Sequence, residues 1–148
     1  MMQKCYTKLK ERGIASTSQR AHILKSMQIR TDHPDAEAVY TSMRANLPAL
    51  SLDTVYRTLH LFAEKGLIQK LAVPTHRFRF EGRLHVHDHF LCTHCEAIID
   101  VDCSDSPHSP VPVAVQAFGE VHVQQRVYLG ICHACAAAQE KLDHTEEL

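Results

Sequence analysis

Hydrophobic residues recur at helical spacing in three segments of the first half of the chain. In residues 15–27 the run STSQRAHILKSM opens with Ser and Thr, which cap helices, and continues with apolar residues three and four positions apart. Residues 34–47 begin with Pro34, which suits a first helical position, and carry a second apolar stripe of Ala36, Val39, Tyr40, Met43 and Leu47. Both segments are predicted to be helices with one buried face.

The third helical segment, residues 51–66, has a potential N-cap at Ser51 and a terminating glycine at Gly66. Its apolar residues predict a face that points toward the core, made of Leu52, Val55, Leu59 and Phe62. The same periodicity predicts an outward face made of Asp53, Tyr56, Arg57 and His60. The segments LIQKLAV and HRFRFE then alternate apolar and polar residues on either side of a turn that contains Pro74, which predicts a β-hairpin. Three helices followed by a basic hairpin predict a winged helix.

The second half of the chain alternates between strand and helix patterns. Short strands are predicted at residues 86–92, 97–102 and 121–129, and helices at residues 112–118 and 133–144. This order predicts an α+β fold: an N-terminal winged-helix DNA-binding domain followed by a small α/β domain. We place the junction between Arg83 and Leu84, which gives domains 1–83 and 84–148.

Charge separates the same two halves. Residues 1–84 contain fourteen Lys and Arg against seven Asp and Glu, a net charge of +7. Residues 85–148 contain two against ten, a net charge of −8. A basic first half suits a polyanion such as DNA, and an acidic second half rich in His and Cys suits cations. No apolar run approaches the ~20 residues of a membrane span, so we expect a cytoplasmic protein with no membrane partner.

Four cysteines form two CxxC pairs, Cys92/Cys95 and Cys132/Cys135. In a reducing cytosol, regularly spaced cysteines bind metal more often than they form structural disulfides. Two such pairs can present four thiolates to one tetrahedral ion, which predicts a structural Zn²⁺ site with no open coordination position. Redox or disulfide use of these pairs is the alternative. The remaining Cys5 and Cys103 are interpreted as packing or incidental residues.

The histidines around this site predict a second ion. In an extended strand His85, His87 and His89 share one face, and three imidazoles suit a divalent transition metal. Oxygen donors would complete the shell of iron or manganese, and the candidates are Glu81 and Asp100. His33, in the first half, could add a nitrogen. The candidate ligands of this second ion are therefore His33, Glu81, His87, His89 and Asp100, with His85 as an additional candidate. The alternative for these histidines is a solvated or indirect role.

The outward face of the third helix carries the candidate DNA contacts. An arginine such as Arg57 can make two hydrogen bonds to guanine, and the ring of Tyr56 can meet a thymine methyl group. Thr54 and Arg20 are further candidates for DNA contact. The alternative is an ordinary polar helix face. The sequence contains no recognisable catalytic nucleophile and base, phosphate-binding glycine loop or catalytic carboxylate pair, so we expect no enzyme; a mononuclear metalloenzyme or a metal buffer is the distant alternative.

The ordered motifs TSQR, DHPDAEAVY, SLDTVYRTL, RFRFEG, HVHDHFLCTHC and GICHAC resemble those of the ferric uptake regulator (Fur) family of bacterial metal-dependent repressors. The resemblance covers nearly the whole chain. It implies a homodimer held together by the C-terminal domains, whose winged helices bind a palindromic double-stranded operator when the regulatory metal is loaded. It also implies that the structural zinc and the regulatory metal lie at the two residue sets given above.

Within the family, the chain resembles the peroxide-sensing branch (PerR) most, because Asp100 stands where iron sensors usually have Glu. That resemblance implies a repressor that uses Fe²⁺ or Mn²⁺, responds to hydrogen peroxide as a signal of oxidative stress, and is oxidised at a ligand histidine, His33 or His87. The chain departs from that branch at Glu81, where the branch has Asp. An iron-sensing regulator is one alternative, and His85 keeps a nickel-sensing (Nur) regulator using Ni²⁺ as another.

Overall fold

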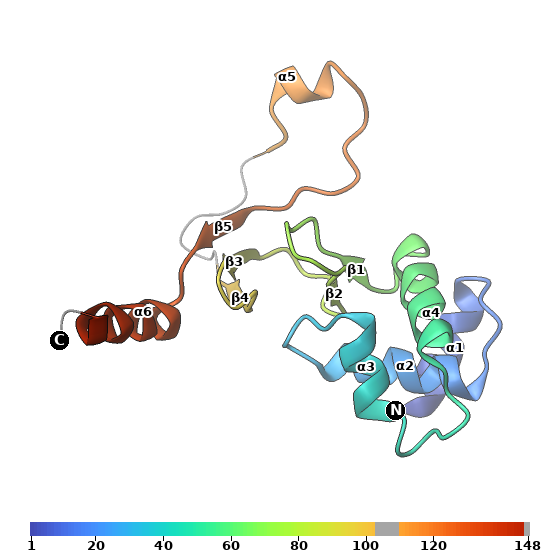
Figure 1. Ribbon diagram of the computed structural model, residues 1–148. Helices are drawn as coiled ribbons and strands as arrows, with labels where there is room; N and C mark the ends of the chain where they lie inside the picture. The colour runs from blue at the N-terminus through green and yellow to red at the C-terminus, as the bar shows by residue number, and fades with distance from the viewer. Residues whose placement is uncertain (103–109, 147–148) are drawn as a thin grey trace. The chain divides into compact units, whose positions relative to one another are not determined.

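The computed structural model describes residues 1–102 and 110–146 of the chain (Figure 1). Contacts divide the chain into two compact units, Met1–His85 and Val86–Leu148, so the division falls two residues beyond the junction placed from the sequence. Cys103 lies outside the described residues, so its interpretation stays a prediction. In the described part of the chain, no helix combines the length and hydropathy needed to cross a membrane.

The first unit is a set of helices followed by a short hairpin. Its elements are α1 (Met2–Glu11), α2 (Ser18–Ile29), α3 (Ala36–Met43), α4 (Leu52–Glu64), β1 (Gln69–Lys70) and β2 (Phe80–Glu81). The three predicted helices are confirmed as α2, α3 and α4. Helix α1 was not predicted, although Met2, Cys5, Tyr6 and Leu9 have helical spacing and pack on the core. Short charged stretches surround these residues, which weakens the periodic signal.

Side chains cap the starts of α2, α3 and α4, because the first backbone N–H groups of a helix have no intrahelical partner. The predicted N-cap is confirmed, since Ser51 Oγ accepts a hydrogen bond from the backbone N–H of Thr54 at 3.1 Å. Asp35 Oδ1 accepts from the N–H of Ala38 at 2.7 Å, and Thr17 caps α2 in the same way. These caps fix where each helix begins, and the spacing of the apolar residues decides which face it buries.

The core of the first unit lies between α1, α2, α3 and α4 (Figure 1). The stripe predicted for α4 is confirmed at Val55, Leu59 and Phe62, all fully buried. It is wrong at Leu52, which is 42% exposed because it is the first residue of the helix and lies beyond the packed layer. Thr58 takes the remaining buried position on that face. The prediction that His60 points outward is also wrong, because its ring contacts Phe78 and Phe80.

The hairpin is paired for a shorter distance than the sequence predicted. Between β1 and β2 the antiparallel ladder joins only Gln69 to Glu81 and Lys70 to Phe80, and one more bond runs from Leu71 N–H to the carbonyl of Arg79 at 2.9 Å. Proline has no N–H to contribute to a ladder, which explains why pairing is not maintained through the segment that contains Pro74. The predicted hairpin is therefore confirmed at its base only.

Gly82 holds the end of the hairpin tightly against α2. A Cβ atom at this position would lie 2.1 Å from the backbone oxygen of Met27, so no larger residue fits without a backbone shift. The close approach fixes the backbone at Gly82, the residue that follows β2. The preceding residue, Glu81, is 3% exposed. The backbone that carries this carboxylate is therefore held in place by backbone packing.

The second unit contains a small mixed sheet and two helices. Its elements are β3 (Asp88–Cys92), β4 (Ile98–Val101), α5 (Val113–Gln116), β5 (Val127–Gly130) and α6 (His133–Glu146). In the sheet, β3 pairs antiparallel with β4 on one side and parallel with β5 on the other. The α+β prediction is confirmed. The last strand begins at Val127 rather than at residue 121, because the 121–126 segment alternates in hydropathy but makes no ladder.

The core of the second unit is thin. Its buried apolar side chains in the described residues are Leu91, Cys92 and Ile98. Many large apolar side chains are exposed instead, including Val113 at 81% and Phe118 at 93%. A domain with so little buried apolar surface needs a further source of stability, such as a metal ion or a partner subunit.

Candidate metal centres and nucleic-acid interface

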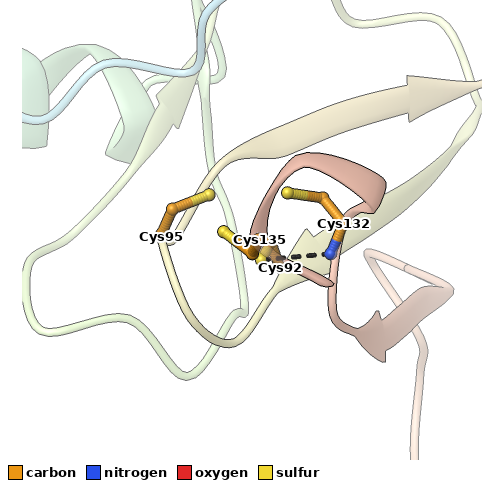
Figure 2. A group of neighbouring side chains, drawn as sticks. All are labelled: Cys92, Cys95, Cys132 and Cys135. Atoms are coloured by element: carbon orange, nitrogen blue, oxygen red, sulfur yellow. Dashed lines mark hydrogen bonds between the residues drawn. The ribbon is translucent and has the colours of Figure 1, made fainter. Parts of the chain in front are cut away.

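The sheet register brings the two CxxC pairs together. Cys92 ends β3 opposite Gly130, the last residue of β5, so the chain reaches Cys132 two residues later and enters α6. The backbone N–H of Cys132 donates to Cys92 Sγ at 3.3 Å (Figure 2). Figure 2 shows the four sulfur atoms turned toward a common centre, and all four lie within 4.8 Å of one another.

The turn after β3 positions Cys95 beside Cys92. Its backbone is held by a hydrogen bond from Glu96 N–H to the carbonyl of Cys92 at 2.9 Å, and Glu96 adopts a positive φ of 58°. Thr93 N–H donates to the carbonyl of Gly130 at 2.8 Å and ties the turn to β5. On the other side, Cys135 lies in the first turn of α6.

The environment shifts the pKa values of Cys92 and Cys135 in opposite directions. Backbone N–H groups of Cys95 and Cys132 donate to Cys92 and lower the pKa of that thiol from 9.0 to about 6. The pKa of Cys135 is raised to about 12, first by its hydrogen bond with Cys132 and then by burial. Thiolates this close together repel one another, and a cation between them would stabilise their ionised forms.

Zinc fits this donor set. Tetrahedral Zn²⁺ binds thiolate sulfur at about 2.3 Å, which places the sulfur atoms roughly 4 Å from one another, close to the spacing found here. The four cysteines are free rather than joined in disulfides, and they occupy every position of a tetrahedral shell. Such an ion would hold the end of β3 to the start of α6 and serve a structural role.

Two of the predicted regulatory ligands lie together in the first unit. His33 Nε2 lies 3.5 Å from Glu81 Oε1, and the two side chains are 1% and 2% exposed. His33 precedes α3 with a positive φ of 49°, which is uncommon for a residue with a Cβ atom. A buried imidazole and a buried carboxylate suit a divalent cation, but two donors do not complete the shell of a transition metal.

The other three predicted ligands lie together in the second unit. His87 Nε2 is 3.1 Å and His89 Nε2 is 3.6 Å from the same oxygen of Asp100, and the two imidazole centroids are 4.5 Å apart. The β3–β4 register explains the arrangement, since His89 and Asp100 are paired residues. Two nitrogens and one oxygen make a second donor set that is also incomplete by itself.

The remaining residues of this stretch take other positions. His85 is exposed and lies before β3, in the first unit. Asp88, the first residue of β3, accepts a hydrogen bond from Arg126 Nε at 2.6 Å. This pair was not predicted from the sequence, where the available signal was Arg126, one of two basic residues in the acidic second half.

The candidate DNA contacts fall on two sides of α4. Arg20, Thr54 and Arg57 line one shallow hollow between the start of α2 and α4. Arg57 is 79% exposed and pairs with Asp53 at 2.9 Å, one helical turn earlier. Tyr56 is 45% exposed and lines a different hollow, between α4 and the hairpin. The structure therefore groups the two arginines with Thr54 and separates them from the tyrosine.

A winged-helix unit joined to a small α/β unit that carries a thiolate site and imidazole–carboxylate donors defines a class of protein, the metal-binding transcriptional regulators. The model of the ferric uptake regulator family matches residues 11–109. The chain belongs to the ferric uptake regulator family. Regulators of this family are dimeric DNA-binding proteins.

Known proteins agree with this placement. The peroxide operon regulator of Bacillus subtilis is 30% identical over 129 residues, which cover 86% of this chain and 88% of the relative. The peroxide-responsive repressor PerR of Staphylococcus saprophyticus is 27% identical over 135 residues and 90% of each chain. Among solved structures, the ferric uptake regulator of Helicobacter pylori has a TM-score of 0.72, with 20% identity over 92% of this chain and 94% of that chain, which supports the fold. The two curated relatives carry the names of regulators rather than of enzymes.

Proposed function

We propose that the protein is a metal-dependent, DNA-binding transcriptional repressor that responds to peroxide. The observation that carries the proposal is a pair of complementary, incomplete donor sets, one in each unit. His33 and Glu81 are buried in the first unit. In the second unit, His87 and His89 both lie close to Asp100. The names of the curated relatives favour peroxide as the signal.

In this proposal, all five donors would bind one Fe²⁺ or Mn²⁺ ion, so that metal binding would fix the first unit relative to the second. Imidazole nitrogens with carboxylate oxygens form a mixed donor set that suits both metals. Bound iron supplies the redox chemistry with peroxide, and the chain supplies the buried donors. A ligand that favours one orientation of the two units by about 1–3 kcal/mol changes operator affinity roughly 5- to 150-fold.

We infer that the protein binds a palindromic operator as a homodimer built through its second unit. The exposed apolar residues of that unit support this arrangement, among them Phe118, Tyr128, Leu129 and Ile131. Exposed apolar side chains gathered in a domain with a thin core are typical of a surface that a second copy covers. Two-fold symmetry of the protein then requires two matching half-sites in the DNA.

Replacing Arg57 with alanine tests the DNA-reading surface. If Arg57 makes two hydrogen bonds to a guanine, the Arg57→Ala variant should lose about 1–3 kcal/mol of operator binding and relax discrimination at that base pair. Fluorescence anisotropy with operator and scrambled duplexes measures both effects. Arg44→Ala, an equal charge change at an exposed residue beyond α3, is the matched control. Equal losses on both duplexes would show that Arg57 contributes charge alone.

Mass spectrometry tests the peroxide response. Protein loaded anaerobically with Fe²⁺ and exposed briefly to hydrogen peroxide should gain one oxygen atom on the peptide that contains His33 or His87, and should release operator DNA. Mn²⁺-loaded protein treated in the same way should show neither change, because Mn²⁺ does not react readily with peroxide. Metal-dependent operator binding without oxidation would reject the peroxide signal and leave a regulator of iron or nickel uptake.

A further inference from the structure

The guanidinium group of Arg79 is bonded to the backbone of a proposed metal ligand. Its Nε donates a hydrogen bond to the carbonyl oxygen of His33, and its Nη2 donates to the carbonyl of Asp32 at 3.2 Å. One planar, doubly donating side chain therefore spans two consecutive carbonyls of the loop before α3. Arginine is the residue whose fixed fork geometry allows this, since a lysine presents its donors from a single atom.

His33 needs such a restraint. Its φ of 49° places it in the left-handed region, which only a few per cent of non-glycine residues occupy. Its imidazole is 1% exposed and directed at Glu81, so the side chain has little freedom once the backbone is set. A backbone in a sparsely populated conformation persists only where its surroundings determine it, and the bond from Arg79 acts on that same residue.

Arg79 is itself fixed by the hairpin. Its carbonyl accepts the hydrogen bond from Leu71, and the next residue, Phe80, donates its N–H to the carbonyl of Pro34 at 3.0 Å. The Phe80 side chain is fully buried against His60 of α4. Residues 79–80 of the hairpin, the return segment, thus contact residues 32–34 before α3 through the backbone of Phe80 and the side chain of Arg79.

The RFRF segment contains a second arginine, Arg77, which provides a comparison for Arg79. Arg77 precedes Arg79 by two residues, in the irregular segment before β2. Arg77, however, pairs with the carboxylates of Glu37 and Asp35 in α3 and its cap. The two arginines have the same charge and lie in the same segment just before β2, and in the described contacts only Arg79 bonds to the carbonyl of His33.

We propose that Arg79 is a positioning residue for the regulatory metal: it holds the His33 backbone so that the imidazole is directed toward the ion together with Glu81. This inference rests on the proposed function, in which His33 is a ligand. The proposal also links metal binding to the hairpin, because Arg79, which orients His33, is part of the hairpin.

The sign of the effect separates positioning from electrostatics. A fixed positive charge near a divalent cation opposes its binding, so loss of the charge alone should tighten metal binding. Loss of a group that orients a metal ligand should weaken it, typically about 10- to 100-fold. Removing the guanidinium therefore moves metal affinity in opposite directions under the two accounts.

The experiment measures Mn²⁺ affinity of the full-length, zinc-loaded protein from the electron paramagnetic resonance signal of the free ion. Arg79→Met should bind Mn²⁺ about 10- to 100-fold more weakly, whereas the matched variant Arg77→Met should stay close to the unaltered protein. Arg79→Lys keeps the charge without the fork and should also bind weakly. Saturating Mn²⁺ should restore operator binding of Arg79→Met, because the DNA-contacting residues are unchanged. Zinc content and thermal unfolding report whether each variant is folded.

His33→Ala separates the two proposals. If His33→Ala loses Mn²⁺ binding while folded Arg79→Met and Arg79→Lys retain or tighten it, the positioning role is rejected and the metal site stands. If His33→Ala retains full Mn²⁺ affinity, the metal site itself is rejected. An equal loss in Arg77→Met and Arg79→Met would assign the effect to the stability of the hairpin and overturn the specific role of Arg79. If Arg79→Met does not fold, Arg79→Lys decides the question by the same measurement.

Discussion

Replacing Cys92 with serine is expected to abolish zinc binding and unfold the second unit. The thiol of Cys92 is one of four sulfur atoms that converge at the end of β3, and few apolar side chains in this unit are buried. Structural zinc contributes about 10–16 kcal/mol of apparent binding free energy in small domains, and this energy is also folding energy where little core exists. Zinc content, measured with a chromophoric chelator, should fall from about one ion per chain to near zero, and circular dichroism should show loss of strand signal.

Cys5→Ser is the matched control, because Cys5 is also buried but lies in α1, where its sulfur is 3.8 Å from Gln28 Oε1. This variant should keep its zinc and the fold of the second unit. A Cys92→Ser protein that remained folded and dimeric without zinc would refute the structural role of the ion. A strong chelator applied to the unaltered protein should reproduce the effect of Cys92→Ser.

The second large effect is expected from His89→Ala, which should remove metal-dependent operator binding. His89 is 2% exposed, is paired with Asp100 across β3 and β4, and is one of the three proposed metal ligands in the second unit. Without it the proposed ion loses a nitrogen ligand, so Mn²⁺ should no longer select the DNA-binding arrangement. The gain in operator affinity on adding Mn²⁺, roughly 5- to 150-fold at typical coupling energies, should fall to near one in an anisotropy titration.

His122→Ala provides the comparison, because the His122 side chain is 78% exposed and its Nδ1 lies 4.0 Å from Glu120 Oε1. Its response to Mn²⁺ should equal that of the unaltered protein. Zinc content should be normal in both variants, which separates loss of the regulatory ion from unfolding of the second unit. Operator binding by His89→Ala that still rises fully with Mn²⁺ would exclude His89 from the regulatory site.

Local sequence patterns predicted helices α2, α3 and α4 of the first unit and the two cysteine pairs. Side chains that recur every three or four residues and capping residues such as Ser51 act within a few positions of the chain, so they can be recognised without tertiary structure. The same holds for a CxxC pair, whose two sulfur atoms are brought together by one turn. The exposure of Leu52 and the ring contacts of the half-buried His60 were not predictable in this way, because each depends on where the core layer ends and which ring the hairpin brings to α4.

The sequence by itself determined which donor types this protein has and how they are spaced. Only the tertiary structure decided their geometry. The β3–β4 register pairs His89 with Asp100, the approach of Gly82 to Met27 sets the strand after Glu81, and Arg79 bonds to the carbonyl of His33 from 46 residues away. The physical reason is that a register, a close backbone approach or a bond between distant residues depends on the packing of whole elements, which no local pattern of side chains encodes.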